Sequence, residues 1–415
     1  MNTYTTLFIC FLAASFAVQL WLSLRHSGHI GRHRRAVPEA FADQVPLADH
    51  QKAADYSIAK GRIGRIELAW GTLLLLAWTL GGGLELLDNF WRTMDWSPEW
   101  TGASVFFTLM LFSGFFDLPF DIYRTFILED RFGFNRTTVK TWLSDKIKGI
   151  VLMLILGLPL LWVVLTLMEN AGENWWFYVW LVWSGFMLLM MWAFPTFIAP
   201  LFNKFSPLED ETLRDRIEKL LERCGFSSNG LFVMDGSKRS SHGNAYFTGF
   251  GSNKRIVFFD TLLDSLDENQ VEAVLAHELG HFKHRHVQIR IVVSILSTLA
   301  ALAVLGWLMQ QSDFYTGLGV TTPSTYMALL LFMMVSPVFL FFLNPISSAL
   351  SRRHEFQADD YAAQQSDANA LVQALVTMYR DNASTLTPDP LHSAFYDSHP
   401  PAPIRVAHLQ ALKSV

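Results

Sequence analysis

Seven long apolar segments constrain this chain more than any other feature of its sequence. A helix needs about 20 mainly apolar residues to cross a bilayer. The segments cover roughly Thr5 to Leu24, Ile66 to Leu87, Ala103 to Ile122, Ile147 to Met168, Trp175 to Ile198, Ile289 to Met309 and Tyr326 to Leu343. Of the 415 residues, 51% are apolar and only 17% are charged, which fits a chain that lies largely in lipid. The sequence therefore predicts a mainly α-helical, multi-pass membrane protein with about seven transmembrane helices.

Lysines and arginines are unevenly distributed over the loops between these segments, and this asymmetry sets the orientation of membrane proteins. They gather in the first and third loops, as Arg25, Arg32, Arg34, Arg35, Lys52, Lys60, Arg62, Arg65 and then Arg124, Arg131, Arg136, Lys140, Lys146, Lys148. The loop near Asn89 to Gly102 contains only Arg92, and residues 310–324 contain neither type. We expect the N-terminus outside, with the C-terminus and the catalytic domain cytoplasmic.

One long stretch of the chain is globular in pattern. We expect four regions: residues 1–198 with helices one to five, residues 199–288 as a small α+β domain, residues 289–343 with helices six and seven, and a C-terminal segment 344–415. Helices are expected at Arg214 to Arg223, Glu268 to His284 and Ser351 to Met378. The short apolar runs Leu231 to Met234, Ala245 to Phe250 and Arg255 to Phe259 predict an antiparallel meander.

The helix expected from Glu268 contains His277-Glu278-Leu279-Gly280-His281, an HExxH motif. Four residues make about one helical turn, so both imidazoles lie on one face and fit two corners of a tetrahedral zinc site. Glu278 points about 100° away around the helix. It is therefore placed to reach a water at the metal and to act as general base. The motif predicts a metallopeptidase site holding one Zn²⁺ per chain.

Zinc in a hydrolase needs a third protein ligand and an open position. The best candidate is Glu355, which we expect to begin a second helix after the last span. Asp359 stands one turn later, where it can accept the outer N–H of a ligating histidine. By themselves these two carboxylates are more typical of a solvated helix face. The competing ligands are His284, His286, His354 and His399, of which His284 and His286 lie in a basic tract that favours an interfacial role.

The sequence resembles the type I CAAX prenyl endopeptidases, which are integral-membrane zinc metallopeptidases of the gluzincin type. The resemblance rests on EDRFGFN from Glu129, PLFNKF from Pro200, HGNAYFTG from His242, HELGH, the ExxxD of Glu355 and Asp359, and SHPPAPIR from Ser398. It implies that Glu355 is the third ligand and Asp359 an outer carboxylate. It also implies that Asn244 and Ala245 lie on an edge strand that pairs with substrate, and that His399 and Arg405 flank the oxyanion. In that family seven helices ring a water-filled chamber.

The resulting expectation is a membrane-embedded zinc endopeptidase that cleaves near the C-terminus of CAAX-type, prenylated peptides. The alternative is a quality-control peptidase for membrane proteins without prenyl specificity. A non-catalytic zinc scaffold is disfavoured because both cysteines lie far from the motif, and an intramembrane protease because charged residues flank it. The expected partners are peptide or protein substrates and the lipid bilayer. Nucleic acid is not an expected partner, because the sequence has no basic run interleaved with aromatic residues.

Overall fold

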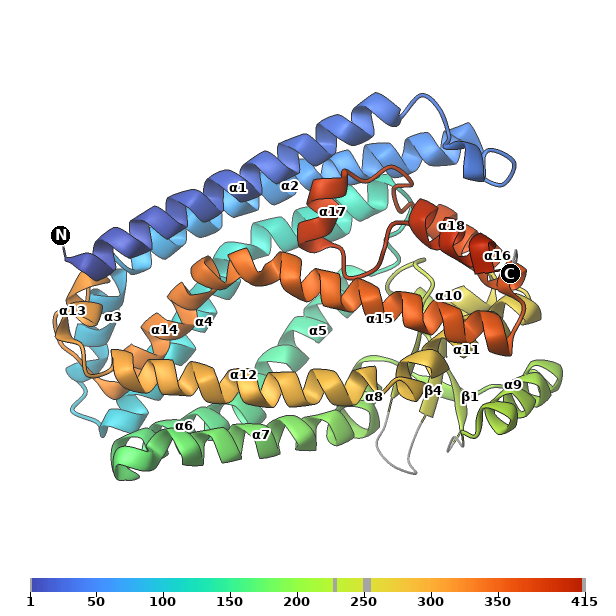
Figure 1. The fold of residues 1–415 in the computed structure, drawn as a ribbon. Coiled ribbons are helices and arrows are strands. Elements are labelled where there is room, and N and C mark those ends of the chain that lie inside the picture. The colour runs from blue at the N-terminus through green and yellow to red at the C-terminus, as the bar shows by residue number, and fades with distance from the viewer. Residues whose placement is uncertain (1, 227–229, 249–254, 413–415) are drawn as a thin grey trace.

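The computed structural model describes residues 2–226, 230–248 and 255–412, and helices dominate it (Figure 1). The long helices run between two ends of an elongated molecule. The N-terminus lies at one end, whereas the small sheet and the C-terminal helix lie at the other. The prediction of a mainly helical fold with a small α+β domain is confirmed.

Six helical stretches in the described part of the chain are long and apolar enough to cross a membrane, and a bent helix pair brings the number to seven. They are Thr3–His33, Leu47–Trp78 with Gly83–Arg92, Pro98–Glu129, Val139–Asn170, Gly172–Phe202, His286–Leu308 and Thr325–Gln365. The seven apolar segments of the sequence coincide with them, and only Met309 of the sixth segment lies beyond its helix. The second is bent by 49° beside Gly82, whose φ of 79° a glycine adopts without steric cost.

The membrane region is built from helices α1 to α7, α12 and α14. Their bounds are α1 Thr3–His33, α2 Leu47–Trp78, α3 Gly83–Arg92, α4 Pro98–Tyr123, α5 Val139–Leu152, α6 Leu158–Asn170, α7 Trp175–Ala193, α12 His286–Leu308 and α14 Thr325–Leu340, with π-helical turns η2 Arg124–Glu129, η3 Met153–Gly157 and η5 Phe194–Ile198. The other helices are α8 Ala199–Phe202, α9 Glu211–Cys224, α10 Asp260–Leu263, α11 Glu268–Lys283, α13 Ser312–Gly317, α15 Asn344–Gln365, α16 Ala368–Asp381, α17 Pro390–Tyr396 and α18 Ala402–Leu412. The helix expected over Ser351 to Met378 is thus two helices, because the chain extends at Ser366 and Asp367 caps α16.

The sheet has four strands in the order β1-β2-β4-β3. The strands are β1 Phe205–Pro207, β2 Leu231–Met234, β3 Ala245–Thr248 and β4 Arg255–Phe259. The expected antiparallel meander is wrong, because β2 pairs with β4 in parallel, with Leu231 opposite Ile256. The buried run Ile256 to Phe258 explains this order, since a continuously apolar strand belongs in the middle of a sheet. Strand β1 was not expected, and the end of the third predicted strand, at Phe250, lies outside the described residues.

Two main hydrophobic cores lie at opposite ends of the molecule. One joins the sheet domain to the C-terminal helices, with Ile217 of α9, Phe258 of β4 and Leu409 of α18 all fully buried. The other joins α1, α4, α6, α12 and α14 near the N-terminus. The described residues between 205 and 283 therefore share one core with residues 355–412, although two membrane spans separate the two regions in the sequence.

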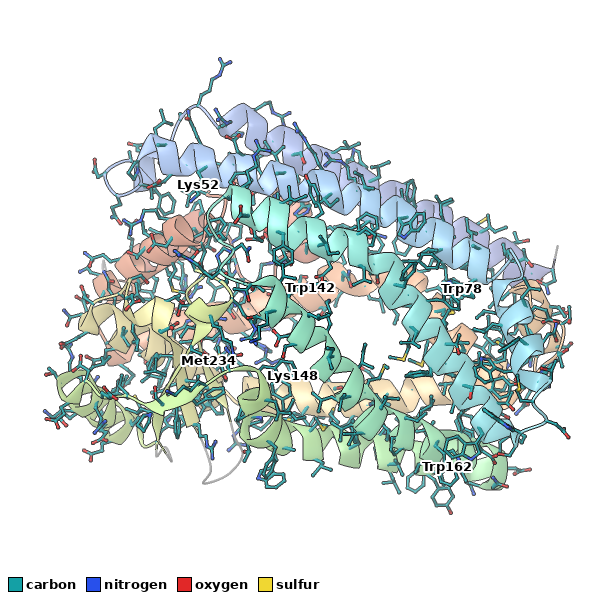
Figure 2. All side chains as sticks on the ribbon, turned by 180° about the vertical axis from the view of Figure 1, so that it is seen from behind. Lys52, Trp78, Trp142, Lys148, Trp162 and Met234 are labelled. Carbon is teal, nitrogen blue, oxygen red and sulfur yellow. The ribbon has the colours of Figure 1, made fainter. Side chains whose placement is uncertain are left out.

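Each end of the molecule also has its own set of loops. At the N-terminal end, the Asn2 amide donates to the Asp313 carbonyl over 2.7 Å, which places residues 310–324 beside the N-terminus. At the sheet end, the Arg136 N–H donates to the Arg239 carbonyl over 3.0 Å. Figure 2 accordingly shows Lys52 and Met234 at the sheet end and Trp162 at the other. The loops rich in lysine and arginine thus lie on the side of the sheet domain.

Candidate metal centre and active site

Helix α11 carries the HExxH motif, and its sequence explains why it begins and ends where it does. Asp267 and Gln270 form a capping box at its start, which satisfies two otherwise unpaired backbone N–H groups. Val271, Leu275 and Leu279 pack into the core of the sheet domain. This burial fixes the rotation of the helix and turns the histidine face toward α15.

Helix α15 crosses α11 at very close range. A Cβ atom added to Gly280 would lie 2.8 Å from the Cα of Ala358, a distance that real Cβ atoms essentially never show. Glycine at position 280 therefore permits the approach. Ala358 lies between Glu355 and Asp359, so the crossing brings both carboxylates to the two histidines. Glu355 lies within α15 and not at its start as expected, because the helix already begins at Asn344, with Pro345 in its first turn.

Three side chains from these helices converge. The Nε2 atoms of His277 and His281 each lie 3.4 Å from one oxygen of Glu355. One ligand atom from each residue lies within 4.8 Å of the others, and among the described residues this is the one such His and carboxylate cluster. His277 and Glu355 are buried. The arrangement leaves two nitrogens and a carboxylate facing a common point, which is a donor set for a divalent metal.

Asp359 and Arg405 surround the outer edge of His277. Asp359 Oδ1 lies 2.8 Å from His277 Nδ1, and Arg405 donates to both oxygens of Asp359 over 2.9 and 2.5 Å. Burial by itself lowers the pKa of His277, but the neighbouring carboxylates of Asp359 and Glu355 raise that pKa to about 9. Burial likewise lowers the pKa of Arg405, and Asp359 more than restores it. Arg405 Nη1 lies 3.9 Å from Glu355, so the buried guanidinium stands between two buried carboxylates.

His286 supports the second histidine. It is buried, because the left-handed turn at Arg285 (φ 58°) folds the chain back toward α11. His286 Nε2 lies 2.9 Å from the Gln357 side-chain oxygen, and its Nδ1 lies 2.9 Å from His281 Nδ1. Since Gln357 accepts from Nε2, His286 Nδ1 is the acceptor for the Nδ1–H of His281. The Nε2 lone pair of His281 is then left free toward Glu355.

The other candidate residues lie as follows. Glu278 is half-buried next to His277 on α11. His399 is exposed, and its Nε2 lies 3.4 Å from Glu355. His284 is exposed, and His354 stacks on His286 at 4.0 Å. The competing histidines therefore lie outside the cluster, with His399 beside it.

Asn244 and Ala245 lie where β3 begins, at the edge of the described sheet. The preceding residues are fixed by Asn382, whose side-chain oxygen accepts the Gly243 N–H over 3.0 Å. His242 stacks on Phe134 at 4.4 Å. The exposed Asn244 thus precedes a strand that pairs, among the described strands, with β4 alone.

Two family models match nearly all of the chain. Residues 26–204 match a model described as CAAX prenyl protease N-terminal, five membrane helices. Residues 207–413 match Peptidase family M48. The boundary between the two falls at β1, where the membrane region passes into the sheet domain.

Individual relatives agree with these models over their whole length. The CAAX prenyl protease 1 homolog of Oryza sativa subsp. japonica is 32% identical and covers 98% of this chain and 97% of its own. The CAAX prenyl protease 1 of Saccharomyces cerevisiae is 32% identical, over 94% of this chain and 91% of its own. The crystal structure of S. mikatae Ste24p matches with a TM-score of 0.93 and 31% identity over 99% of both chains.

Proposed function

The chain belongs to peptidase family M48 and, within it, to the CAAX prenyl proteases of type 1. From this premise we propose that it is a zinc-dependent endopeptidase acting near the C-terminus of prenylated CAAX peptides. It is a multi-pass membrane metalloprotease. The observation that carries the proposal is the convergence of His277, His281 and Glu355 from two helices that each adjoin a membrane span.

The three side chains suit zinc. Ligand atoms about 2.0–2.1 Å from a tetrahedral zinc lie about 3.3–3.4 Å apart. The two histidine nitrogens are each 3.4 Å from a Glu355 oxygen. Among the described residues, the buried Oε2 of Glu355 has no hydrogen-bond partner. A buried carboxylate oxygen without a partner suits a metal ligand. When bound there, zinc lowers the pKa of water and polarises the scissile carbonyl.

Glu278 is the proposed general base. It is the one carboxylate within the HExxH motif, and it is half-buried next to His277 on α11. It takes a proton from the attacking water and passes it to the leaving amine. For both proton transfers the Glu278 carboxylate must reach the side of α11 on which His277 and His281 lie.

His399 and Arg405 are proposed to stabilise the negative charge that develops on the carbonyl oxygen. Exposed and 3.4 Å from Glu355, His399 has the freedom to donate toward substrate. Arg405 is more restricted, because two of its nitrogens donate to Asp359. It contributes mainly positive charge and holds Asp359 against His277.

An extended substrate is proposed to add to the free edge of β3. Its backbone would pair with the backbone at Asn244 and Ala245, as in other proteins that bind peptides by strand addition. Residues 242–243, held by Asn382, tie this edge to the end of α16. Strand addition orients the scissile bond through backbone hydrogen bonds and contacts few side chains. Selectivity for a CAAX end must therefore come from another part of the protein. We place that selectivity in a chamber enclosed by the seven spans.

The test uses the purified full chain and a peptide pair that differs only in a farnesyl group on its cysteine. We expect faster cleavage of the farnesylated peptide and loss of cleavage with a chelator, restored by zinc. Glu278→Gln should keep the metal and lose roughly 100-fold to 10,000-fold in kcat, since an amide cannot accept the proton. Equal cleavage of both peptides would favour the quality-control function instead.

A further inference from the structure

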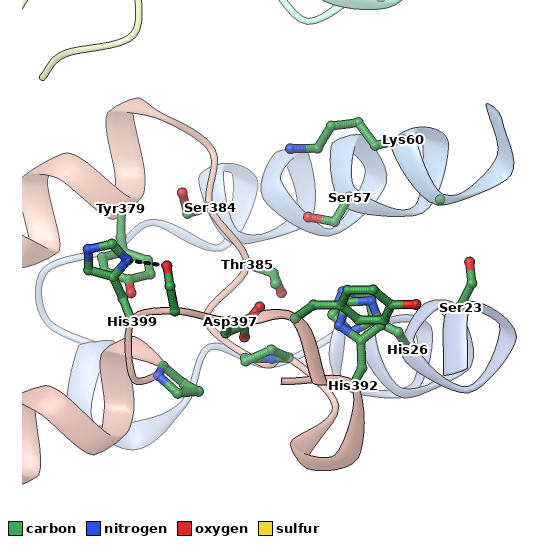
Figure 3. A pocket seen from close by; sticks show the side chains of 15 residues that line it. Ser23, His26, Ser57, Lys60, Tyr379, Ser384, Thr385, His392, Asp397 and His399 are labelled. Carbon is green, nitrogen blue, oxygen red and sulfur yellow. Dashed lines mark hydrogen bonds between the residues drawn. The ribbon is translucent and has the colours of Figure 1, made fainter. Parts of the chain in front are cut away.

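A cavity of about 490 Å³ adjoins the active site at His399. His399 lines it at the site end, and the remaining walls come from α1, α2, α16, α17 and the loops on both sides of α17 (Figure 3). Its volume is in the range of about 300–1,000 Å³ typical of small-ligand sites. Hydroxyl groups of Ser57 and Thr385 line it.

The positive charge at the cavity is the side-chain ammonium of Lys60 in α2. Its side chain is exposed, and in the described part of the chain no carboxylate oxygen lies within 4.0 Å of its ammonium. The contact that it makes is with the Tyr56 ring, 4.0 Å from the ring centroid. The nearby Glu129 is already engaged by the Tyr56 hydroxyl over 2.5 Å. The ammonium therefore remains available to an anion from outside the chain.

Two further groups define the charge pattern of the cavity. His26 accepts the Asp389 N–H at Nδ1 over 3.2 Å, which leaves Nε2–H of the neutral ring as a donor. Asp389 itself is neutralised by Arg25 at 2.9 Å. Asp397 supplies a carboxylate close to His399, and Figure 3 places it across the cavity from Lys60. The cavity thus has a negative group near the scissile position and a positive group away from it.

A short peptide released from the end of a substrate has the opposite pattern. Its new amine lies at the scissile position and its carboxylate at the far end, about 10 Å away for three extended residues. We propose that this cavity binds the released C-terminal fragment, with the Lys60 ammonium bound to its terminal carboxylate. This proposal rests on the proposed function. Binding of the terminal carboxylate by Lys60 would fix how far from the C-terminus the substrate is cleaved.

The test compares two farnesylated peptides of one sequence, one ending in a free carboxylate and the other in an amide. The wild-type chain should cleave the acid with a kcat/KM roughly 10-fold to 100-fold above that of the amide, the range of a charge-assisted hydrogen bond. Lys60→Met should lower kcat/KM for the acid to the level of the amide and leave the amide unchanged. Lys60→Arg should retain part of the preference.

Lys52→Met is the matched control, because Lys52 is also an exposed lysine of α2 set over an aromatic ring, that of Phe134, but lies outside the cavity. It should retain the full preference. Equal cleavage of acid and amide by the wild-type chain, or an equal loss for both in Lys60→Met, would overturn this inference and leave the proposed function intact. Cleavage of neither peptide would overturn the proposed function, and this inference with it.

Discussion

At the scale of single residues, the two histidines of α11 are held by different partners. His277 has a charged one, since Asp359 lies 2.8 Å from its Nδ1. His281 has a neutral one, His286. A carboxylate makes an imidazole a stronger donor to a metal than a neutral partner does. We therefore expect His277 to hold the metal more tightly than His281.

The proposed third ligand can be tested by metal content. Glu355→Ala should weaken zinc binding by more than about 100-fold, because losing even an outer partner costs about 10-fold to 100-fold. His284→Ala and His354→Ala are the controls, since neither ring enters the cluster. Metal analysis of the purified variants decides the assignment. Full zinc occupancy in Glu355→Ala would refute it.

His286 gives a second prediction. His286→Ala removes the acceptor for His281 Nδ1–H, which frees that ring to turn or to change tautomer. Zinc affinity, measured by competition with a chelator, should fall about 10-fold to 100-fold. Gln357→Leu should have a smaller effect in the same direction. An unchanged affinity in His286→Ala would show that packing alone orients His281.

The sequence reveals some of these residues more readily than others. His277 and His281 are recognisable because one helical turn fixes their spacing, whatever surrounds them. The same holds for Glu355 and Asp359 once a family pattern is known. His286 is not recognisable in this way, because its position depends on a left-handed residue, Arg285, and on Gln357 from a helix far along the chain.

At the scale of elements, the crossing of α11 and α15 determines whether the site can form. Gly280→Ala places a methyl group 2.8 Å from the Ala358 Cα, against backbone that cannot move aside alone. We expect a loss of about 1–3 kcal/mol, typical of overpacking, together with weaker metal binding. Thermal unfolding in detergent and chelator competition measure the two effects.

Gly149→Ala is the control for this prediction, because it lies in α5 and a Cβ there meets nothing within 4 Å. That variant should unfold at the same temperature or higher, since alanine favours a helix by about 1 kcal/mol over glycine. A Gly280→Ala protein as stable as Gly149→Ala, with unchanged zinc affinity, would contradict the importance of the close crossing.

Elements differ in how well a sequence predicts them. A transmembrane helix satisfies its own backbone hydrogen bonds, so its apolar length alone reveals it, and all seven segments were found. A strand of three to five residues acquires its partners from distant chain. That is why the parallel pairing of β2 and β4 was missed, and why Phe205–Pro207 gave no strand signal at all.

At the scale of the whole molecule, we propose that the sheet domain faces the cytoplasm and the N-terminus the outside. The basis is the concentration of lysine and arginine in loops at the sheet end. In a chain with Cys10 and Cys224 replaced by alanine, Thr322→Cys and Ala407→Cys give exposed thiols at opposite ends. A membrane-impermeant thiol reagent applied from outside should label only Thr322→Cys in intact cells, and permeabilisation should add Ala407→Cys. Labelling of both from outside would refute the orientation.

The metal cluster joins two neighbouring membrane spans. Helix α12 begins directly after the turn that ends α11, and α15 continues from α14 through the short turn Phe341–Leu343. Spans tilt to match the thickness of the surrounding hydrocarbon, at a cost of fractions of a kcal/mol per Å of mismatch. Only the turns at His284–Arg285 and Phe341–Leu343 separate these spans from α11 and α15. We therefore expect the acyl-chain length of the surrounding lipids to change the zinc affinity of the purified protein, which chelator competition in bilayers of different thickness would measure.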